Sequence, residues 1–523
     1  MDTQHEHLNT QRDKLVRLRK LESTINWCIW VPLCISSFVY AVTISKKYAH
    51  LVPPHSVTET WFGLRVDNSD TEWTGWVSNI YSMTLVSSVF SVSSVAVRFL
   101  VPRALVMFQT ILSLFLLSWV MSWNGVLVVL VHMLAFLCVL KTGSVKLVWV
   151  WSLLVLYVMP SDGFWDMSKL VLPLDEDNRE LVIIGLLMCY LRFLSYGHHI
   201  LQPNNSNSSN NNNNTSSINS NNDSNINNSN YNTTNVRNAS LLHFTHYTFY
   251  VPLFFNGPLL TYDLFNVPLE ERNKIDVYDI SRATLTSLLY ACGLHLFFSI
   301  VFTTAIATYS HILLHITPFE SVIVMWMLIQ VFYMKYVVFY RSSGVFVKMD
   351  GLVPPEGPRC ITSLYTFTHM WRFFDRGLHR FLGQSIYVPL GGSRAGIVQQ
   401  MLSSLCCFAF VAHWHTGGAT MWLWAAFNYV GIAVEKCVGL LTTCGVLDTV
   451  LDMLSLRMYR RVCALCGALL VVGLIWSNIV FLVGYEAALV LITKSLSGGV
   501  TFFLYVIGVM YFCCQCSMDC LCD

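Results

Sequence analysis

The side chains best suited to chemistry lie between Met370 and Arg380, where aromatic and ionisable residues are mixed. In an apolar chain, such a mixture is typical of a segment that lines a wet cavity or lies at a membrane interface. If the segment is helical, Asp375 has Arg372 at i−3 and His379 at i+4 on the same face. These residues therefore predict an ion-paired, orienting carboxylate in a protein-lined pocket.

A second candidate group is the pair of histidines in Phe410–Gly418, where an apolar run ends before a turn of small residues. An imidazole titrates near neutral pH and is therefore a common general base. On a helix, residues two apart point about 200° away from each other, so His413 and His415 are not both expected to face one cavity. No His or Glu follows either residue at i+4, which disfavours a metal site. At least one of the two is expected to be a packing or interfacial residue.

Three further features are less specific. Asn256-Gly257-Pro258 interrupts an apolar run and predicts either a shaped cavity wall or a simple kink. Lys335 and Glu435 lie in or at the ends of apolar segments, where long charged side chains extend to the interface. The sequence contains no P-loop, no dinucleotide-binding glycine pattern and no nucleophile elbow.

The composition indicates where these side chains have to be placed. Of 523 residues, 54% are hydrophobic and 12% are charged, whereas a soluble domain carries about 25% charged residues. The formal net charge of +2 provides no basic excess for a nucleic-acid partner. A disordered scaffold is excluded, an ordinary cytosolic enzyme is disfavoured, and a membrane protein is expected.

The N-terminal part is expected to cross the membrane several times. Residues 1–24 form a polar tail whose basic residues place it in the cytosol by the positive-inside rule. Residues 25–200 hold the predicted N-terminal transmembrane helices, and the first span is expected at 25–44. Further apolar segments lie at about 76–97, 104–122, 125–140, 147–159 and 181–197. Six crossings would return the chain to the cytosol.

Residues 201–240 form an Asn-rich insert. Between Asn204 and Asn238, 18 of 35 residues are asparagine. Such a tract cannot bury enough apolar surface to offset its chain entropy, so it is expected to be disordered. It contains N-x-S/T sequons, whose use requires lumenal exposure. The crossing count therefore predicts that these sequons stay unmodified.

Residues 241–516 are expected to form the transmembrane core. Apolar segments lie at about 243–265, 284–315, 319–341, 398–414, 419–434, 462–484 and 498–516, which gives some 10 to 13 in the chain. Only helices and closed barrels satisfy backbone groups in lipid, and these runs are too long for barrel strands. The fold class is therefore an all-α polytopic membrane protein. A transporter is disfavoured because no inverted repeat is evident.

Residues 517–523 are expected to be a Cys-rich C-terminal tail. The cysteines of this end have no second half with zinc-ligand spacing. They are expected to be unmodified surface thiols, and S-acylation is the alternative. The cluster comprises Cys513, Cys514, Cys516, Cys520 and Cys522.

Taken in order, the motifs of this chain resemble the membrane-bound O-acyltransferase superfamily, and within it the Hedgehog acyltransferase branch. The resemblance is strong over about 320–436 and weaker from about 243 and in the N-terminal spans. It is carried by Asn256-Gly257-Pro258, Met349–Cys360, Met370–Asp375, Gly377-Leu378-His379, Tyr387–Ser393, Trp414-His415 and Trp422–Ala426.

The resemblance implies a helical bundle with a transmembrane tunnel and re-entrant segments, in the endoplasmic reticulum membrane. It implies transfer of palmitate from palmitoyl-CoA to the N-terminal cysteine of a secreted Hedgehog-type protein. His415 and Asp375 would be the catalytic residues, and Cys360 would hold the iron of haem b. Substrate binding would fall to Trp371, Arg372, Trp414 and Asn256.

Two alternatives stay open beside this assignment. A sibling acyltransferase would use another acceptor, such as a protein Ser or a lipid hydroxyl, with the same histidine. A non-catalytic relative would bind the acyltransferase or its substrate as a regulator. Such a relative would be expected to have lost the histidine, so the presence of His415 and Asp375 argues against it.

The Asn-rich insert generates a first prediction. Deletion of residues 204–238 should leave acyl transfer unchanged, because the tract is expected to be cytosolic and outside the core. Gel mobility of the full-length chain should not change after endoglycosidase treatment. A mobility shift that disappears on deleting the tract would contradict the crossing count.

Overall fold

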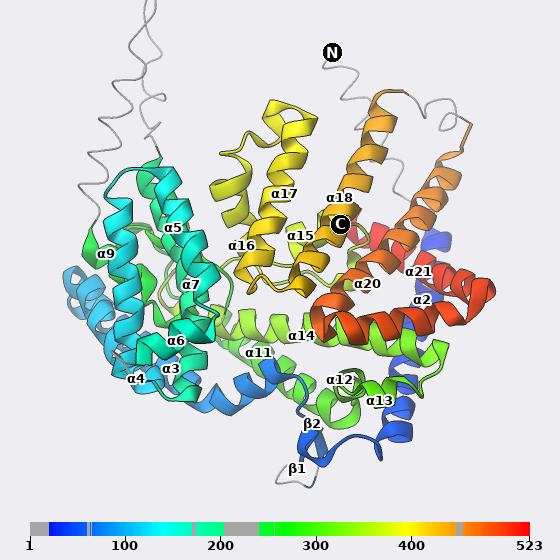
Figure 1. Cartoon of the computed structure of the whole chain (residues 1–523), viewed down its shortest axis with the longest axis horizontal. Coiled ribbons are helices and arrows are strands. Elements are labelled where there is room, and N and C mark those ends of the chain that lie inside the picture. The colour runs from blue at the N-terminus through cyan, green and yellow to red at the C-terminus, as the bar shows by residue number, and fades with distance from the viewer. Residues whose placement is uncertain are drawn as a thin grey trace, which may run out of the picture.

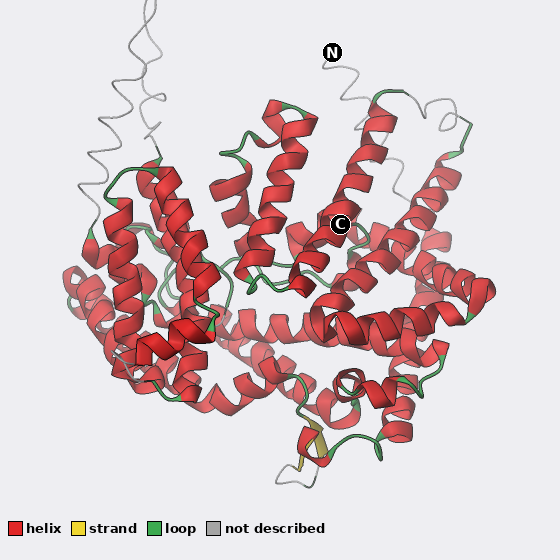
Figure 2. Cartoon of the chain, in the orientation of Figure 1, coloured by secondary structure: helices red, strands yellow, loops and turns green. Residues whose placement is uncertain are grey.

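The computed structural model of the chain is almost entirely helical (Figure 2). It describes residues 20–59, 63, 65–169, 174–202, 240–255, 257–445 and 453–522. Within these ranges the one sheet is a small antiparallel hairpin of β1 (Val57–Glu59) and β2 (Arg65–Asp67). The predicted all-α fold is therefore confirmed. Most of the predicted N-terminal tail and the tract 204–238 lie outside the described residues.

The helices of the N-terminal half begin at polar capping residues. Asp70 precedes α3, and its carboxylate accepts a hydrogen bond from the Trp73 backbone N–H at 2.8 Å. Ser144 caps α5 through the Leu147 N–H in the same way. These helices are α2 (Lys20–Tyr48), α3 (Thr71–Leu100), α4 (Leu105–Leu140), α5 (Val145–Val158), α6 (Asp162–Lys169) and α7 (Glu176–Leu201).

The C-terminal half contains both long and very short helices. The longest uninterrupted one, α14, starts with a capping box between Thr317 and Glu320 and has Pro318 at its first position. The helices are α9 (Leu241–Thr248), α10 (Tyr262–Phe265), α11 (Val277–Ile300), α12 (Thr303–Thr308), α13 (Ser310–Leu313), α14 (Pro318–Met349), α15 (Phe367–Phe373), α16 (Arg376–Leu382), α17 (Ile397–Trp414), α18 (Ala419–Thr443), α20 (Leu456–Ser497) and α21 (Gly499–Cys522).

Ten of the described helices are long and apolar enough to cross a membrane, so the chain is a multi-pass membrane protein. Four of the ten precede the Asn-rich insert, where the sequence predicted six segments. Segments 104–122 and 125–140 are joined in α4, which carries non-helical dihedral angles at Met121 and Ser122. α5 has only 14 residues, fewer than the ~20 that a straight span needs. The side of the membrane on which the insert lies therefore stays a prediction.

The apolar segment 243–265 does not form a spanning helix. It contains α9, a 3-10 turn at Val251–Leu253 and α10. The break is stabilised by the buried side chain of Arg192 on α7, which donates to the Thr248 carbonyl at 2.7 Å and also to the Leu253 carbonyl. A buried arginine in this position satisfies backbone carbonyls that a continuous helix would have satisfied itself.

Helix α14 lies at the centre of the molecule (Figure 1). It contacts α2, α3, α11, α12 and α20, and buried side chains occur along its whole length. In Figure 1, helices α3 to α7 and α9 form one group on the left, and α2, α20 and α21 form another on the right. The helices α15 to α18 lie above α14 in this view, and α15 contacts both α16 and α18.

Lys335 on α14 is only 4% exposed. Its ammonium lies 2.9 Å from the Asp70 carboxylate and 2.7 Å from the Glu72 carboxylate, both at the start of α3. The expectation that this side chain extends to the interface was therefore wrong. Two carboxylates from another helix compensate the buried charge, so the ammonium stays inside the protein.

The C-terminal cysteines also depart from the prediction. α21 continues to Cys522, and Cys513, Cys514 and Cys516 are buried. The Cys513 thiol and the Ser517 hydroxyl donate to the Thr362 carbonyl at 3.6 and 2.6 Å. These thiols are not at the surface because the end of α21 packs against the loop that precedes α15.

The buried ion pairs generate a prediction. Lys335→Ala should lower the free energy of unfolding by about 3 kcal/mol, because two neighbouring carboxylates lose their counter-ion. Lys348→Ala is the matched control on the same helix, since Lys348 forms a more exposed pair with Asp279. Thermal unfolding of both variants in detergent measures the difference, and equal effects would contradict the role of burial.

Candidate active site

A cavity of about 760 Å³ lies between α3, α7, α14 and α15, the start of α16, the end of α17 and the middle of α20. Pockets that bind small molecules commonly have volumes of about 300–1,000 Å³. The wall is mostly apolar and aromatic. Its polar and ionisable lining residues are Thr71, Glu72, Asn79, Glu180, Tyr336, Tyr340, Asp375, His415 and Asn478, together with the indole groups of Trp76, Trp371, Trp414 and Trp424.

His415 lines this cavity directly after the end of α17. Its ring is surrounded by aromatic side chains: ring centroids are 4.5 Å from Trp414, 5.2 Å from Phe481 and 6.1 Å from Trp424. Among the described residues, no side chain or backbone group forms a hydrogen bond with its imidazole nitrogens.

His413 lies outside the cavity. Its Nε2 is 2.9 Å from the Leu153 carbonyl on α5, and its ring stacks on Tyr157. The expectation that the two histidines do not share one cavity is confirmed. The structure distinguishes them because α17 ends between them and turns only His415 toward α14 and α20.

Asp375 also lines the cavity, although the helix predicted through it is broken there. α15 ends at Phe373, and Asp375 caps α16 by accepting a hydrogen bond from the Leu378 N–H at 2.9 Å. Its other carboxylate oxygen accepts from the Tyr340 hydroxyl at 2.5 Å. The predicted ion pair was therefore wrong: Arg372 and His379 are exposed, and the carboxylate is held by a backbone N–H and a tyrosine.

The remaining predicted contact residues are divided between the cavity and the surface. Trp371 and Trp414 line the cavity, whereas Arg372 is exposed and does not. The Trp414 indole donates to the Leu187 carbonyl on α7 at 2.9 Å. Asn256 lies outside the described residues, but its neighbour Gly257 lines the wall with a φ of 114°.

One face of α18 holds α15 in place. The Trp371 indole donates to the Asn428 side chain at 3.2 Å. Two turns further along α18, the Glu435 carboxylate accepts from the backbone N–H groups of Phe367 and Thr368 at 2.5 and 3.0 Å. Between these two residues of α18, Gly431 allows the Phe367 ring to pack closely. A Cβ at position 431 would lie only 2.6 Å from that ring. Glu435 therefore caps the start of α15, and its position relative to the membrane interface stays a prediction.

Cys360 is exposed and does not line the cavity. Its thiol lies 3.0 Å from the Thr362 hydroxyl. The described surroundings of Cys360 give no support to a haem site, and no step of the chemistry is assigned to haem.

The acidic character of the cavity was not anticipated from the sequence. Its charged lining residues, among those described, are the carboxylates Glu72, Glu180 and Asp375, without a lysine or arginine. Nearby arginines pair elsewhere: Arg376 with Glu356, and Arg380 with Asp263 at 2.5 Å. Glu72 is paired with Lys335, so the lining carboxylates without an ion pair among the described residues are Glu180 and Asp375, which favour a cationic group over an anionic one.

Sequence analysis also missed Tyr336 and Tyr340, which line the cavity from α14. The Tyr336 hydroxyl donates to the Glu72 carboxylate at 3.1 Å. The available signal was their spacing of four residues, which puts both hydroxyls on one face of a helix. Tyrosines in an apolar run are common, so the pattern alone did not separate them from packing residues.

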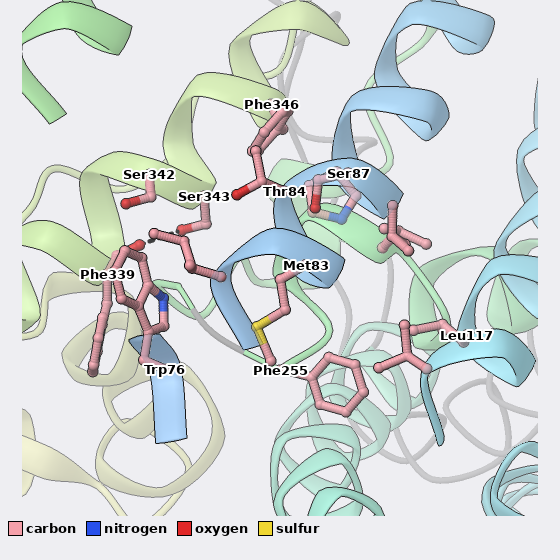
Figure 3. Close-up of a pocket in the computed structure, with 15 residues that line it drawn as sticks. Trp76, Met83, Thr84, Ser87, Leu117, Phe255, Phe339, Ser342, Ser343 and Phe346 are labelled. Carbon is pink, nitrogen blue, oxygen red and sulfur yellow. Dashed lines mark hydrogen bonds between the residues drawn. The ribbon is translucent and has the colours of Figure 1, made fainter. Parts of the chain in front are cut away.

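A smaller pocket of about 70 Å³ adjoins the main cavity between α3, α14 and the turn at 251–255 (Figure 3). Trp76, Met83, Phe255 and Phe339 line both spaces. The hydroxyls of Thr84, Ser87, Ser342 and Ser343 border the smaller one. The inner wall of α3 is therefore not fully packed against α14.

The capping of α15 generates a prediction. Glu435→Ala should speed hydrogen exchange of the Phe367 and Thr368 amides, because these N–H groups lose their acceptor. The matched control is Glu486→Ala, since Glu486 is an exposed acid on α20. Hydrogen-exchange mass spectrometry of peptides covering α15 measures the effect. Unchanged exchange in Glu435→Ala would contradict the cap.

The amino-acid sequence of this chain is similar to those of several known acyltransferases. Mouse (Mus musculus) protein-cysteine N-palmitoyltransferase HHAT is 35% identical over 254 residues, which cover 46% of this chain and 49% of the mouse protein. Protein-cysteine N-palmitoyltransferase Rasp of Drosophila melanogaster is 27% identical over 279 residues, covering 52% and 54%. Membrane-bound O-acyltransferase GUP1 of Millerozyma farinosa is 28% identical over 189 residues, covering 36% and 37%.

The similarity to these relatives covers only part of the chain, whereas the match to a protein-family model covers most of it. The chain spans about half the length of the two palmitoyltransferases that it matches. Residues 66–475 match the model of the MBOAT, membrane-bound O-acyltransferase family. This match covers most of the chain and includes His415, Asp375 and the helices that hold them. The chain therefore belongs to the membrane-bound O-acyltransferase family.

Proposed function

We propose that the protein transfers palmitate from palmitoyl-CoA to the N-terminal cysteine amine of a secreted Hedgehog-type protein. The observation that carries the proposal is the common position of His415 and Asp375 in one cavity that also carries Trp371. The similarity to two protein-cysteine N-palmitoyltransferases supports this choice of donor and acceptor. Acyl-CoA is the donor that membership of the family implies.

The reaction requires alignment and the movement of one proton. The amine nitrogen attacks the thioester carbonyl, a C–N bond forms, and the C–S bond to CoA breaks. A thioester is already activated, and alignment alone can contribute about 7–11 kcal/mol to the lowering of the barrier. The nitrogen loses a proton and the CoA sulfur gains one, so a single base can serve both steps.

His415 is the proposed base. An α-ammonium has a pKa of about 7.7–8.0, so an imidazole near neutral pH can accept its proton. The imidazole nitrogens of His415 have no hydrogen-bond partner among the described residues, which leaves them to the substrate. His415 would take the proton from the amine and deliver it to the departing CoA sulfur.

Asp375 is proposed to orient the acceptor amine. No hydrogen bond joins Asp375 to His415 within the described part of the chain, which favours a role toward the substrate over polarisation of the imidazole. A fixed carboxylate attracts an ammonium and aligns the amine after it has lost its proton. The acidic lining of the cavity supports an amine acceptor in the same way.

The proposal includes the location. An acyl-CoA from the cytosol and a secreted protein in the lumen would meet in a tunnel of which this cavity is the central part. The membrane would be that of the endoplasmic reticulum, with the N-terminus in the cytosol. The short helices α15 and α16 would be re-entrant segments, because each has 7 residues and neither is long enough to span.

A second candidate function is acylation of a protein or lipid hydroxyl. The similarity to membrane-bound O-acyltransferase GUP1 favours keeping it. A hydroxyl carries no charge, so an acidic lining would give it no advantage over an amine. Transfer to an N-terminal Cys peptide, compared with the N-acetylated peptide and an N-terminal Ala peptide, separates the two acceptor classes.

The catalytic assignment gives a prediction. His415→Ala should abolish palmitate transfer while the protein remains folded, because the imidazole is the base in the cavity. His413→Ala is the matched control, since that ring lies outside the cavity, and it should retain transfer. Transfer of labelled palmitate to a Hedgehog N-terminal peptide by microsomes carrying each variant measures the difference. Full activity of His415→Ala would refute the assignment.

A further inference from the structure

The Asp375 carboxylate is held from two directions. One oxygen accepts the Leu378 N–H at 2.9 Å, within the first turn of α16. The other accepts a hydrogen bond from the Tyr340 hydroxyl at 2.5 Å, from the C-terminal half of α14. A carboxylate that accepts one hydrogen bond on each oxygen from two separate elements has a fixed orientation. Its remaining acceptor directions are then available in the cavity.

Tyr340 is the only side-chain donor that reaches this carboxylate among the described residues. The basic side chains near Asp375 in sequence are engaged elsewhere or exposed: Arg376 pairs with Glu356, Arg380 with Asp263, and Arg372 is at the surface. Removing the Tyr340 hydroxyl would leave Asp375 held by the α16 backbone alone. The carboxylate could then rotate about its side-chain torsions.

Tyr340 is itself immobilised. Its residue is 8% exposed, and its ring makes an edge contact with Tyr336 at 5.7 Å. One turn earlier on α14, Tyr336 donates to Glu72, and Lys335 pairs with Glu72 and Asp70. These contacts fix this part of α14 against the start of α3. The hydroxyl of Tyr340 is therefore presented from a rigid element.

We infer that Tyr340 is a positioning residue for the reaction. It acts through Asp375: its hydroxyl keeps the carboxylate aimed at the place where the acceptor amine lies, and it forms no bond to the reacting atoms. The inference rests on the proposed function. Misplacement of an orienting group impairs the chemical step more than the binding of the donor, because alignment is needed only when the amine attacks.

Tyr340→Phe tests the inference, because it removes one hydroxyl and retains the ring. We expect kcat for palmitate transfer to fall about 10- to 100-fold, the effect of losing a hydrogen bond to a charged group. The KM for palmitoyl-CoA should stay within about twofold, since the donor does not depend on the orientation of Asp375. Both constants are measured with the full-length protein in detergent or vesicles, with an N-terminal Cys peptide as acceptor.

The matched control is Tyr190→Phe on α7. It removes another buried hydroxyl, which lies 3.0 Å from His132, and neither residue lines the cavity. Its kcat should equal that of the wild-type protein. Thermal unfolding of both variants measures the fraction of each protein that is folded under the assay conditions. The kcat of each variant is then calculated per folded molecule, so that a loss of kcat does not reflect unfolding.

The results of these assays distinguish a failure of the role inferred for Tyr340 from a failure of the proposed function. Normal kcat in Tyr340→Phe, or a loss no larger than that of Tyr190→Phe, overturns the inference while the function stands. A raised palmitoyl-CoA KM with unchanged kcat also overturns it, because the hydroxyl would then serve donor binding. If the wild-type protein acylates neither the amine peptide nor a hydroxyl acceptor, the proposed function fails and the inference fails with it.

Discussion

A charged group inside a helical bundle has to be paired, and Lys335 meets this requirement on α14. Its ammonium is compensated by Asp70 and Glu72, both at the start of α3. Asp70 also caps the start of α3, so one carboxylate both begins this helix and fixes it to α14. Because α3 and α14 form two walls of the cavity, the position of the site depends on this buried cluster.

The same requirement shapes the short helices beside the cavity. A helix of two turns inside a membrane protein leaves N–H groups that water does not reach, so other residues must accept from them. Glu435 does so for α15, and Asp375 does so for α16. Asp375 thus has a structural role that is independent of any chemistry. Its carboxylate is nevertheless directed into the cavity, since Tyr340 holds its second oxygen.

Several features of the site follow from the way acids and bases are distributed. The charged residues lining the cavity are carboxylates, and the neighbouring arginines pair outside it. His415 is surrounded by aromatic rings, and its imidazole nitrogens have no hydrogen-bond partner among the described residues. An imidazole without such a partner suits the proposed thioester reaction, in which the amine must lose a proton and the acyl donor needs little activation.

The sequence by itself determined the helical membrane class, since local composition and spacing reflect helix formation and burial. The family resemblance pointed to His415 and Asp375 as candidate site residues. Helical geometry alone indicated that His413 and His415 do not share one cavity, and the family resemblance favoured His415. Only the tertiary structure decided the partners: Asp375 binds Tyr340 instead of Arg372, Lys335 pairs with Asp70, and Glu435 caps α15. It also joined two predicted spans in α4 and buried the C-terminal thiols. Partners such as Lys335 and Asp70, 265 residues apart, are brought together by packing, which local sequence patterns do not encode.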